Sequence, residues 1–272
     1  MGVKKVRLDK FLSDHTELTR SQIKKKVAAG LVGVNGVIIK DAGFKVVADE
    51  EIELEGNRIC GSQYQYLIFH KPAGLVSATE DAREETVLDA ISRGGFAGKG
   101  EPPAYLAKDL FPMGRLDKDT EGLLIVTNDG PLAHRLLSPR FHVEKTYLVR
   151  LDIPVTREDV VKMAEGLDIG EKRRTMPAKM EIVSERECLL TITEGKYHQV
   201  KRMFHQLGKE VVYLKRVEMA GISLDDSLEK GQWRMLTQQE IEKLKEQTNG
   251  KKEILCSKER KDSGDLSDVG GL

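Results

Sequence analysis

The chain has 272 residues, of which 39% are hydrophobic and 32% are charged, and its 44 basic residues balance its 44 acidic ones. This length suits one large domain or two smaller ones, and the composition is that of a polar globular protein. No apolar run approaches the ~20 residues of a membrane-spanning helix, and the N-terminus has no apolar signal segment, so we expect neither a membrane protein nor a secreted one.

The neutral total hides an uneven distribution of charge along the chain. Residues 1–40 contain nine Lys or Arg against three Asp or Glu, a net charge of +6. Residues 41–62 contain two against six, a net charge of −4. The chain can therefore present a basic surface, and its total charge does not exclude a nucleic acid as partner.

Residues 1–59 are predicted to form a small α+β module. Apolar residues recur at helical spacing over residues 8–12 and again over residues 23–27, which predicts two helices. Asn35-Gly36 then separates two short runs of β-type residues, which is among the strongest sequence signals for a hairpin. A further strand is predicted near residues 51–54.

A short linker at residues 60–63 is predicted to lead into a second domain of residues 64–244, in which strand and helix patterns alternate. Residues 92–108 are rich in Gly, Pro and Lys and are predicted to form an exposed loop. Residues 245–272 have few apolar side chains to bury, so we expect a disordered, charged tail. The strands of this domain are predicted at residues 66–69, 123–127, 146–151, 188–193 and 211–217, and the helices at 131–137, 157–166, 197–207 and 239–244.

The densest group of polar residues is Gly114-Arg-Leu-Asp-Lys-Asp-Thr-Glu-Gly122. Its alternating carboxylates imitate a calcium loop, but the twelfth position holds Asn128 where a glutamate is required, so we expect no calcium site. Two interpretations are left for this segment. It is either a solvated turn, or a functional loop that holds an acid such as Asp117 at the edge of a strand.

A second polar cluster lies on the helix predicted at residues 197–207. Apolar side chains form one stripe of this helix, and basic side chains gather on the other side. No third metal ligand is evident near the histidines, so the basic side is either an ordinary surface or a site that binds phosphate or a carboxylate. Its residues are His198, Lys201, Arg202 and His205.

The sequence contains no motif for a nucleotide, metal or redox cofactor. The glycine-rich stretch at residues 94–100 lacks the residues of a P-loop, and the patterns GxGxxG, HExxH and GxSxG do not occur. Cys60, Cys188 and Cys256 are too far apart for a disulfide framework or a zinc motif, which is typical of a cytoplasmic protein. We therefore expect cytoplasmic chemistry that relies on side chains alone, with no cofactor and no metal.

Four separated motifs occur in the order typical of the RsuA-type ribosomal RNA pseudouridine synthases, a family that the chain resembles over about residues 4–244. The first sixty residues resemble the S4 RNA-binding module that precedes the catalytic domain in this family. The resemblance implies an α+β protein whose second domain has a mixed, mainly antiparallel sheet flanked by helices. The motifs are Lys71-Pro-Ala-Gly74, Gly114-Arg-Leu-Asp117, Lys145-Thr-Tyr147 and Gly195-Lys-Tyr-His-Gln-Val-Lys201.

The resemblance also implies an activity, the isomerisation of a uridine in ribosomal RNA to pseudouridine, and roles for single residues. Asp117 matches the family's catalytic aspartate, Tyr147 the tyrosine that packs against the target base, and Lys201 the basic residue paired with the aspartate. Arg115 is a further candidate, which would occupy the space left by the extruded base. The reaction requires an ionised carboxylate, which a neighbouring cation would favour, and a base turned out of its stack.

RNA affinity is expected to come mainly from phosphate contacts by basic side chains. For the lysine triplet at residues 24–26 the alternative role is a solubilising surface. Its position ahead of a hairpin and an RNA-modifying domain favours RNA contact. The residues predicted to contact RNA are Arg7, Lys10, Arg20, Lys24, Lys25, Lys26, Lys71, His198 and Arg202.

The expected partner is ribosomal RNA or a ribosome-assembly intermediate, and the chain is expected to be a monomer. The strings at residues 145–149 and 197–204 favour small-subunit over large-subunit ribosomal RNA as the substrate. A non-catalytic RNA-binding assembly protein is the alternative from another class. The joint presence of Asp117, Tyr147 and Lys201 argues against it, because RNA binding alone needs no buried carboxylate that faces phosphates.

Overall fold

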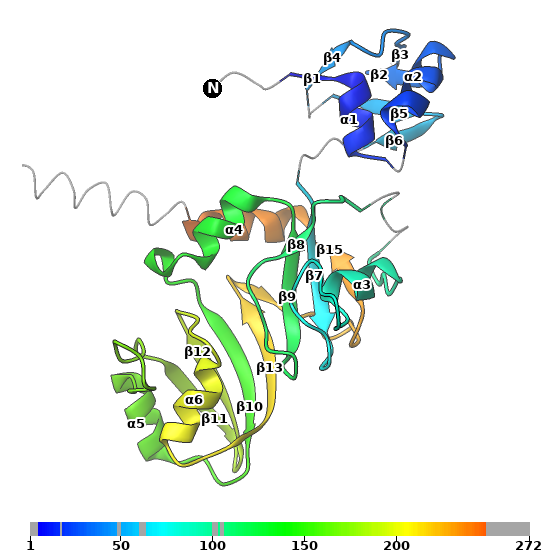
Figure 1. The fold of residues 1–272 in the computed structure, drawn as a ribbon. Helices are drawn as coiled ribbons and strands as arrows, with labels where there is room; N and C mark the ends of the chain where they lie inside the picture. Colours follow the sequence, from blue (N-terminus) through cyan, green and yellow to red (C-terminus); the bar gives the residue numbers. More distant parts are fainter. Residues whose placement is uncertain are drawn as a thin grey trace, which may run out of the picture. The chain divides into compact units, whose positions relative to one another are not determined.

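The structure is a computed structural model that describes residues 5–16, 18–47, 50–59, 64–99, 103 and 106–248 (Figure 1). The chain divides into two compact units, Met1–Gln65 with Gly98–Leu110, and Tyr66–Ala97 with Phe111–Leu272. Part of the loop predicted at residues 92–108 thus groups with the first unit and not with the second. The linker predicted at residues 60–63 lies outside the described residues. Among the helices that are described, none has the length and apolar character needed to cross a membrane.

The first unit contains two helices and two small sheets. Strand β1 pairs with β4, and the other four strands form a sheet in the order β3-β2-β5-β6. The predicted helices, hairpin and following strand of this region are confirmed. The elements are β1 (Val6–Arg7), α1 (Leu8–Asp14), α2 (Arg20–Ala28), β2 (Val32–Val34), β3 (Val37–Ile38), β4 (Lys45–Val46), β5 (Ile52–Leu54) and β6 (Asn57–Ile59).

Local sequence signals explain how these elements begin and turn. The side chains and backbone N–H groups of Thr19 and Gln22 bond to each other in a capping box, which fixes the start of α2. Asn35 and Gly36 both have positive φ, 51° and 76°, as the two-residue turn between β2 and β3 requires. The apolar faces of both helices and of the strands meet in one core, with Leu8 and Ile23 among its fully buried members.

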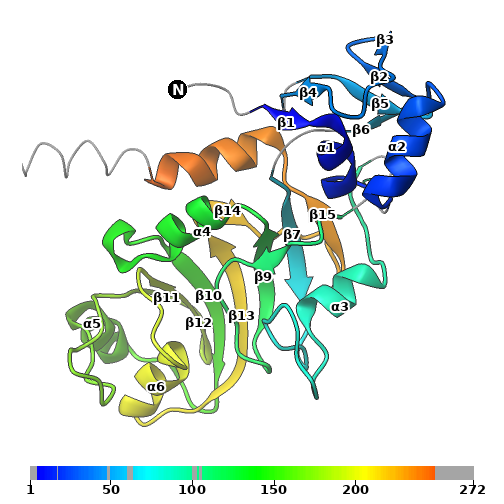
Figure 2. The same cartoon turned by 45° about the horizontal axis from the view of Figure 1, so that its top comes forward.

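The second unit is built on a mixed sheet with the strand order β11-β12-β10-β13-β9-β7-β15, to which β14 and β8 add at β13 and β9. The pairing of β13 with β9 is parallel and the other described pairings are antiparallel, so the predicted fold class is confirmed. Figures 1 and 2 show α5 and α6 beside β10–β12, and α3 beside β7. The elements are β7 (Tyr66–Lys71), α3 (Val87–Ser92), β8 (Phe111–Pro112), β9 (Glu121–Thr127), α4 (Gly130–Leu137), a 3-10 helix (Pro139–Phe141), β10 (Lys145–Leu151), α5 (Arg157–Glu165), β11 (Lys179–Ser184), β12 (Glu187–Ile192), α6 (Gln199–Gln206), β13 (Val211–Met219), β14 (Ile222–Ser223) and β15 (Trp233–Met235).

The strands and helices predicted for this unit are all present, each within a few residues of its predicted ends. The sequence patterns missed α3, β8, β11, β14 and β15. These elements are short or lack a regular apolar pattern: β11, for example, buries one side chain of its six. Such a strand is stabilised by pairing with its neighbour β12, which a local pattern does not reveal.

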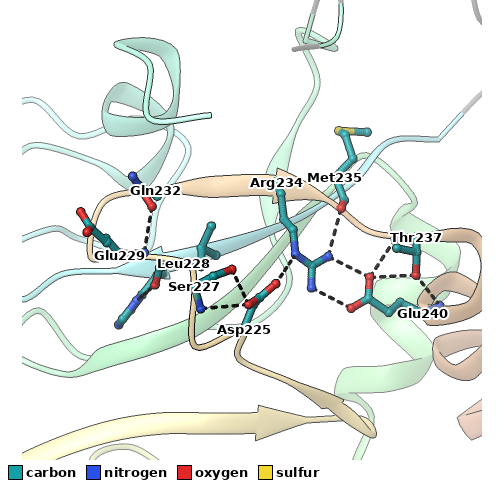
Figure 3. Close-up of polar contacts among 10 residues, drawn as sticks. Asp225, Ser227, Leu228, Glu229, Gln232, Arg234, Met235, Thr237 and Glu240 are labelled. Atoms are coloured by element: carbon teal, nitrogen blue, oxygen red, sulfur yellow. Dashed lines mark hydrogen bonds and ion pairs between the residues drawn. The ribbon is translucent and has the colours of Figure 1, made fainter. Parts of the chain in front are cut away.

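The last described helix runs over residues 238–248, further than predicted. Figure 3 shows how Arg234 in β15 joins it to the sheet, since its guanidinium donates to Asp225 and, at 2.9 Å, to each carboxylate oxygen of Glu240. Glu240 also accepts a hydrogen bond from the backbone N–H of Thr237, which caps the helix. Residues 245–248, predicted to belong to the tail, are thus helical, and the rest of the predicted tail lies outside the described residues.

Candidate active site

A pocket of about 590 Å³ opens in the second unit. The loop between β8 and β9 lines one side, residues 193–200 line another, and the side chains of β10, β12 and β13 form its floor. Two further basic residues of the floor, Lys145 and Arg216, had no predicted role. The predicted site residues that line the pocket are Arg115, Asp117, Tyr147 and His198.

Asp117 lies in the β8–β9 loop, and its side chain is 28% exposed. One carboxylate oxygen is 3.6 Å from Nζ of Lys201 and the other is 3.6 Å from Nε2 of His198. Both basic residues come from α6 or from its N-cap, some eighty positions further along the chain. Tertiary structure therefore brings the two polar clusters of the sequence together, as the family resemblance implies.

Lys201 has a nearer partner than Asp117. Its Nζ donates to both carboxylate oxygens of Asp119, at 2.6 and 2.7 Å. The hydrogen bond from Lys201 lowers the pKa of Asp119 below its usual value. The sequence predicted a simple pair of Lys201 with Asp117, whereas the structure shows one ammonium between two acids.

The structure corrects the prediction that Lys71 contacts RNA. Its side chain is fully buried, and Nζ donates to the backbone carbonyl groups of Pro72, Asp117, Lys118 and Thr120 at 2.9–3.1 Å. Burial lowers the pKa of Lys71 to about 8, against the attraction of the neighbouring acids. Lys71 therefore anchors the loop that carries Asp117, and no donor of it reaches the surface.

Gly122 permits the close approach of backbone that places this loop. It faces Arg216 in the parallel pairing of β9 with β13, and its φ is +105°. A Cβ atom at this position would lie 2.2 Å from the carbonyl oxygen of Arg216, which is closer than two such atoms can approach. The glycine that ends the polar motif is therefore required by packing.

The floor of the pocket combines one aromatic ring with two cations. Tyr147 on β10 is paired with Arg216 on β13, so both side chains lie on the same face of the sheet, and both are buried. Lys145, two positions before Tyr147, points to that face too. Burial, assisted by the charge of Arg216, lowers the pKa of Lys145 to about 8.

The remaining predicted residues of the second unit differ in accessibility. Arg115 is exposed at the pocket. His198 has φ of +47° and stacks on the ring of the exposed Tyr197, with the ring centres 3.8 Å apart. Arg202 does not line the pocket, because its guanidinium binds Glu171 and the carbonyl groups of Tyr197 and Ile169. These contacts leave few donors of Arg202 for RNA.

The basic residues predicted to bind RNA in the first unit fall into two groups. Lys10, Lys26, Arg7 and Arg20 form ion pairs with acids of the same unit. Lys24 and Lys25 on α2 are exposed and have no ion-pair partner among the described residues. Those two lysines are the ones most available to a phosphate.

Comparison with known proteins assigns the family. Residues 65–206, more than half of the chain, match the family model described as "RNA pseudouridylate synthase", and residues 6–52 match the "S4 domain". The chain belongs to the RNA pseudouridine synthase family. The resemblance found in the motifs is thereby confirmed, as are the enzyme class and the S4 module.

Relatives of the synthase match along nearly their full length. The "Uncharacterized RNA pseudouridine synthase YtzG" of Bacillus subtilis is 44% identical over 246 residues, which cover 89% of this chain and 99% of the relative. The "Ribosomal small subunit pseudouridine synthase A" of Haemophilus influenzae is 42% identical over 241 residues, with coverage of 88% and 99%. A solved structure titled "Crystal structure of pseudouridylate synthase" superposes with a TM-score of 0.60 at 42% identity, and the match covers 88% of this chain and 99% of that one.

Proposed function

We propose that this synthase converts a uridine of small-subunit ribosomal RNA to pseudouridine, and that the carboxylate of Asp117 is the catalytic group that attacks the substrate. The observation that carries the proposal is the position of Asp117 in a pocket that also contains the ring of Tyr147, with the ammonium of Lys201 3.6 Å away. Relatives named as small-subunit synthases, such as that of Haemophilus influenzae, support the choice of RNA.

The proposed reaction is an isomerisation in which no group is gained or lost. The bond between N1 of uracil and C1′ of ribose breaks, the base turns, and C5 bonds to C1′. The proton leaves C5, and N1 acquires one. The carboxylate of Asp117 bonds transiently to the sugar or the base, which divides one difficult step into two easier ones. This bond breaks again before the product is released, and the carboxylate is regenerated. Nothing in these steps needs an electron acceptor or donor.

We propose that the target base enters the pocket after it is turned out of its stack. Unstacking costs a few kcal/mol, and stacking on an aromatic ring returns roughly 1–3 kcal/mol. The ring of Tyr147 lines the pocket and is held on β10, so it can receive the base with little loss of side-chain freedom. Arg115 is exposed at the pocket, and in this proposal it occupies the space left by the extruded base.

RNA is held, in this proposal, by phosphate contacts of the S4 unit and of residues near the pocket. Lys24 and Lys25 are exposed and have no ion-pair partner among the described residues, and His198 lines the pocket. The substrate is ribosomal RNA or an assembly intermediate that contains it. A cytoplasmic location and a monomeric state remain predictions of the sequence.

The test compares pseudouridine maps of ribosomal RNA from cells that contain the wild type, Asp117→Asn or no synthase. We expect one site in small-subunit RNA to lose its pseudouridine without the synthase or with Asp117→Asn. In vitro, Asp117→Asn should lower turnover at least about 10³-fold, with RNA affinity unchanged within about twofold. Asp226→Asn, an exposed acid outside the pocket, is the control and should be fully active.

Each outcome separates the possible errors. Modification of large-subunit RNA instead would overturn the proposed choice of substrate and would leave the proposed reaction unchanged. Wild-type turnover by Asp117→Asn would overturn the assignment of the acid.

A further inference from the structure

The guanidinium of Arg216 has a hydrogen-bond donor for which the described residues supply no acceptor. The residue is 2% exposed, and its Nε donates to the carbonyl oxygen of Leu123 at 2.8 Å. Its Nη2 is buried and has no hydrogen-bond partner among the described residues. No carboxylate of those residues lies within ion-pair distance of it. An unsatisfied buried donor on a permanent cation destabilises the folded state, so its retention calls for a functional reason.

The position of Arg216 supplies that reason. Its side chain lines the pocket and is paired across the strands with Tyr147, the proposed stacking partner of the base. A flat base that lies on the tyrosine ring presents its carbonyl oxygens at its edges. The guanidinium of Arg216 belongs to the same floor and therefore lies near the edge of such a base, whereas Asp117 comes from the β8–β9 loop at the side of the pocket.

The two lysines nearby, the buried Lys71 and the half-buried Lys145, are less suited to this task. Lys71 already donates to four carbonyl groups, and Lys145 donates to the carbonyl oxygen of Val143. Arginine keeps its charge at all pH values at which proteins fold, and its planar donors suit a carbonyl oxygen in the plane of a base.

We propose that Arg216 is a further catalytic residue, whose free Nη2–H donates to a carbonyl oxygen of the everted uracil. The proposal rests on the proposed function. When the N1–C1′ bond breaks, its electron pair leaves with the base, and the negative charge spreads over N1, O2 and O4. If Asp117 attacks the sugar, its carboxylate oxygen bonds to the electron-poor C1′ as this bond breaks. A fixed cation on the floor of the pocket stabilises such developing charge without reorganisation. When C5 then bonds to C1′, any bond between C1′ and Asp117 breaks and its electron pair returns to the carboxylate. C5 loses its proton and N1 gains one, so the negative charge on the base is gone.

The test combines a change in the protein with a change of one atom in the RNA. Target RNAs carry uridine, 2-thiouridine or 4-thiouridine at the modified position, because sulfur is a weak hydrogen-bond acceptor. Wild type and Arg216→Met are compared on each RNA in single-turnover assays. Arg186→Met, an exposed arginine outside the pocket, is the control variant and should match the wild type.

We expect Arg216→Met to lower the maximal single-turnover rate on uridine about 10²-fold, while the enzyme concentration that gives half of this rate changes less than about threefold, since phosphate contacts dominate RNA affinity. Sulfur at the contacted oxygen should slow the wild type about 10-fold or more, and should slow Arg216→Met much less. A purely structural role for Arg216 would give the same sulfur effect in both proteins, which would overturn the proposal.

Wild-type rates that are unchanged by sulfur at both positions would overturn it too, even if Arg216→Met did not fold. If the wild type formed no pseudouridine in any ribosomal RNA, the proposed function itself would fail. The two failures are therefore distinguishable.

Discussion

The ammonium of Lys201 lies 2.6 Å from a carboxylate oxygen of Asp119, an acid whose side chain is 71% exposed. Its distance to the pocket acid Asp117 is 3.6 Å. An ion pair with an exposed acid contributes little to stability, because water competes for both charges. We infer that Asp119 holds Lys201 near the pocket without being essential to the charge balance of Asp117.

This relationship predicts opposite results for two neutralising substitutions. Lys201→Met should lower turnover at least about 10²-fold, because Asp117 then loses its nearest cation. Asp119→Asn should keep turnover within about fivefold of the wild type, since Lys201 can move toward Asp117. Initial rates of pseudouridine formation at saturating RNA measure both. If the two substitutions lowered the rate of pseudouridine formation equally, Lys201 would act through Asp119.

Lys71→Met should disorder the β8–β9 loop and lower turnover by at least about tenfold, because three carbonyl groups of that loop lose their donor. The pH dependence of stability gives a second signature. Lys71 has a folded pKa of about 8 and an ordinary value of 10.5, so between these values the unfolded chain binds more protons. Stability of the wild type should therefore rise with pH across this window, relative to Lys71→Met.

Urea denaturation of both proteins at pH 7, 8, 9 and 10 tests that sign. The difference in the free energy of unfolding should change by at most about 1.4 kcal/mol per pH unit above pH 8, and little below it. If the difference in the free energy of unfolding between the two proteins stayed constant from pH 7 to 10, the lowered pKa of Lys71 would be contradicted.

Gly122→Ala should destabilise the second unit by at least about 3 kcal/mol. The new methyl group would meet the backbone of Arg216, and alanine is strained at φ of +105°. Gly130→Ala is the matched control, because nothing lies within 4 Å of its added atom and it opens α4. Its stability should stay within about 0.5 kcal/mol of the wild type. Thermal unfolding of the three proteins settles the comparison.

Simultaneous change of Lys24 and Lys25 to alanine should weaken RNA binding and reduce the slope of log affinity against log salt by up to about 1.8. Both side chains are exposed and without ion-pair partners among the residues described. Lys26→Ala should alter the slope less, because Nζ of Lys26 already pairs with Glu55 at 2.6 Å. If the double variant had the same slope of log affinity against log salt as the wild type, these lysines would not contact RNA and would only increase solubility.

Local features of this protein could be read from the sequence because neighbouring residues determine them. Asn35-Gly36 makes the hairpin turn by its own backbone preference, and apolar periodicity revealed the principal helices and strands of both units. The family motifs pointed to Asp117, Tyr147 and Lys201 as one group. In the structure Asp117 and Tyr147 line one pocket, and the ammonium of Lys201 lies 3.6 Å from Asp117.

The partner of each polar group was decided by tertiary structure. Lys71 was predicted to contact RNA and Arg216 had no predicted role, yet strand pairing buries both. Nζ of Lys71 donates to carbonyl oxygens, whereas Nη2 of Arg216 has no acceptor among the described residues. The local sequence around a lysine or arginine does not specify which distant strand will lie beside it. Burial and hydrogen bonding between β7, β9 and β13 arise when the sheet assembles, and the chemistry of the pocket follows from that assembly.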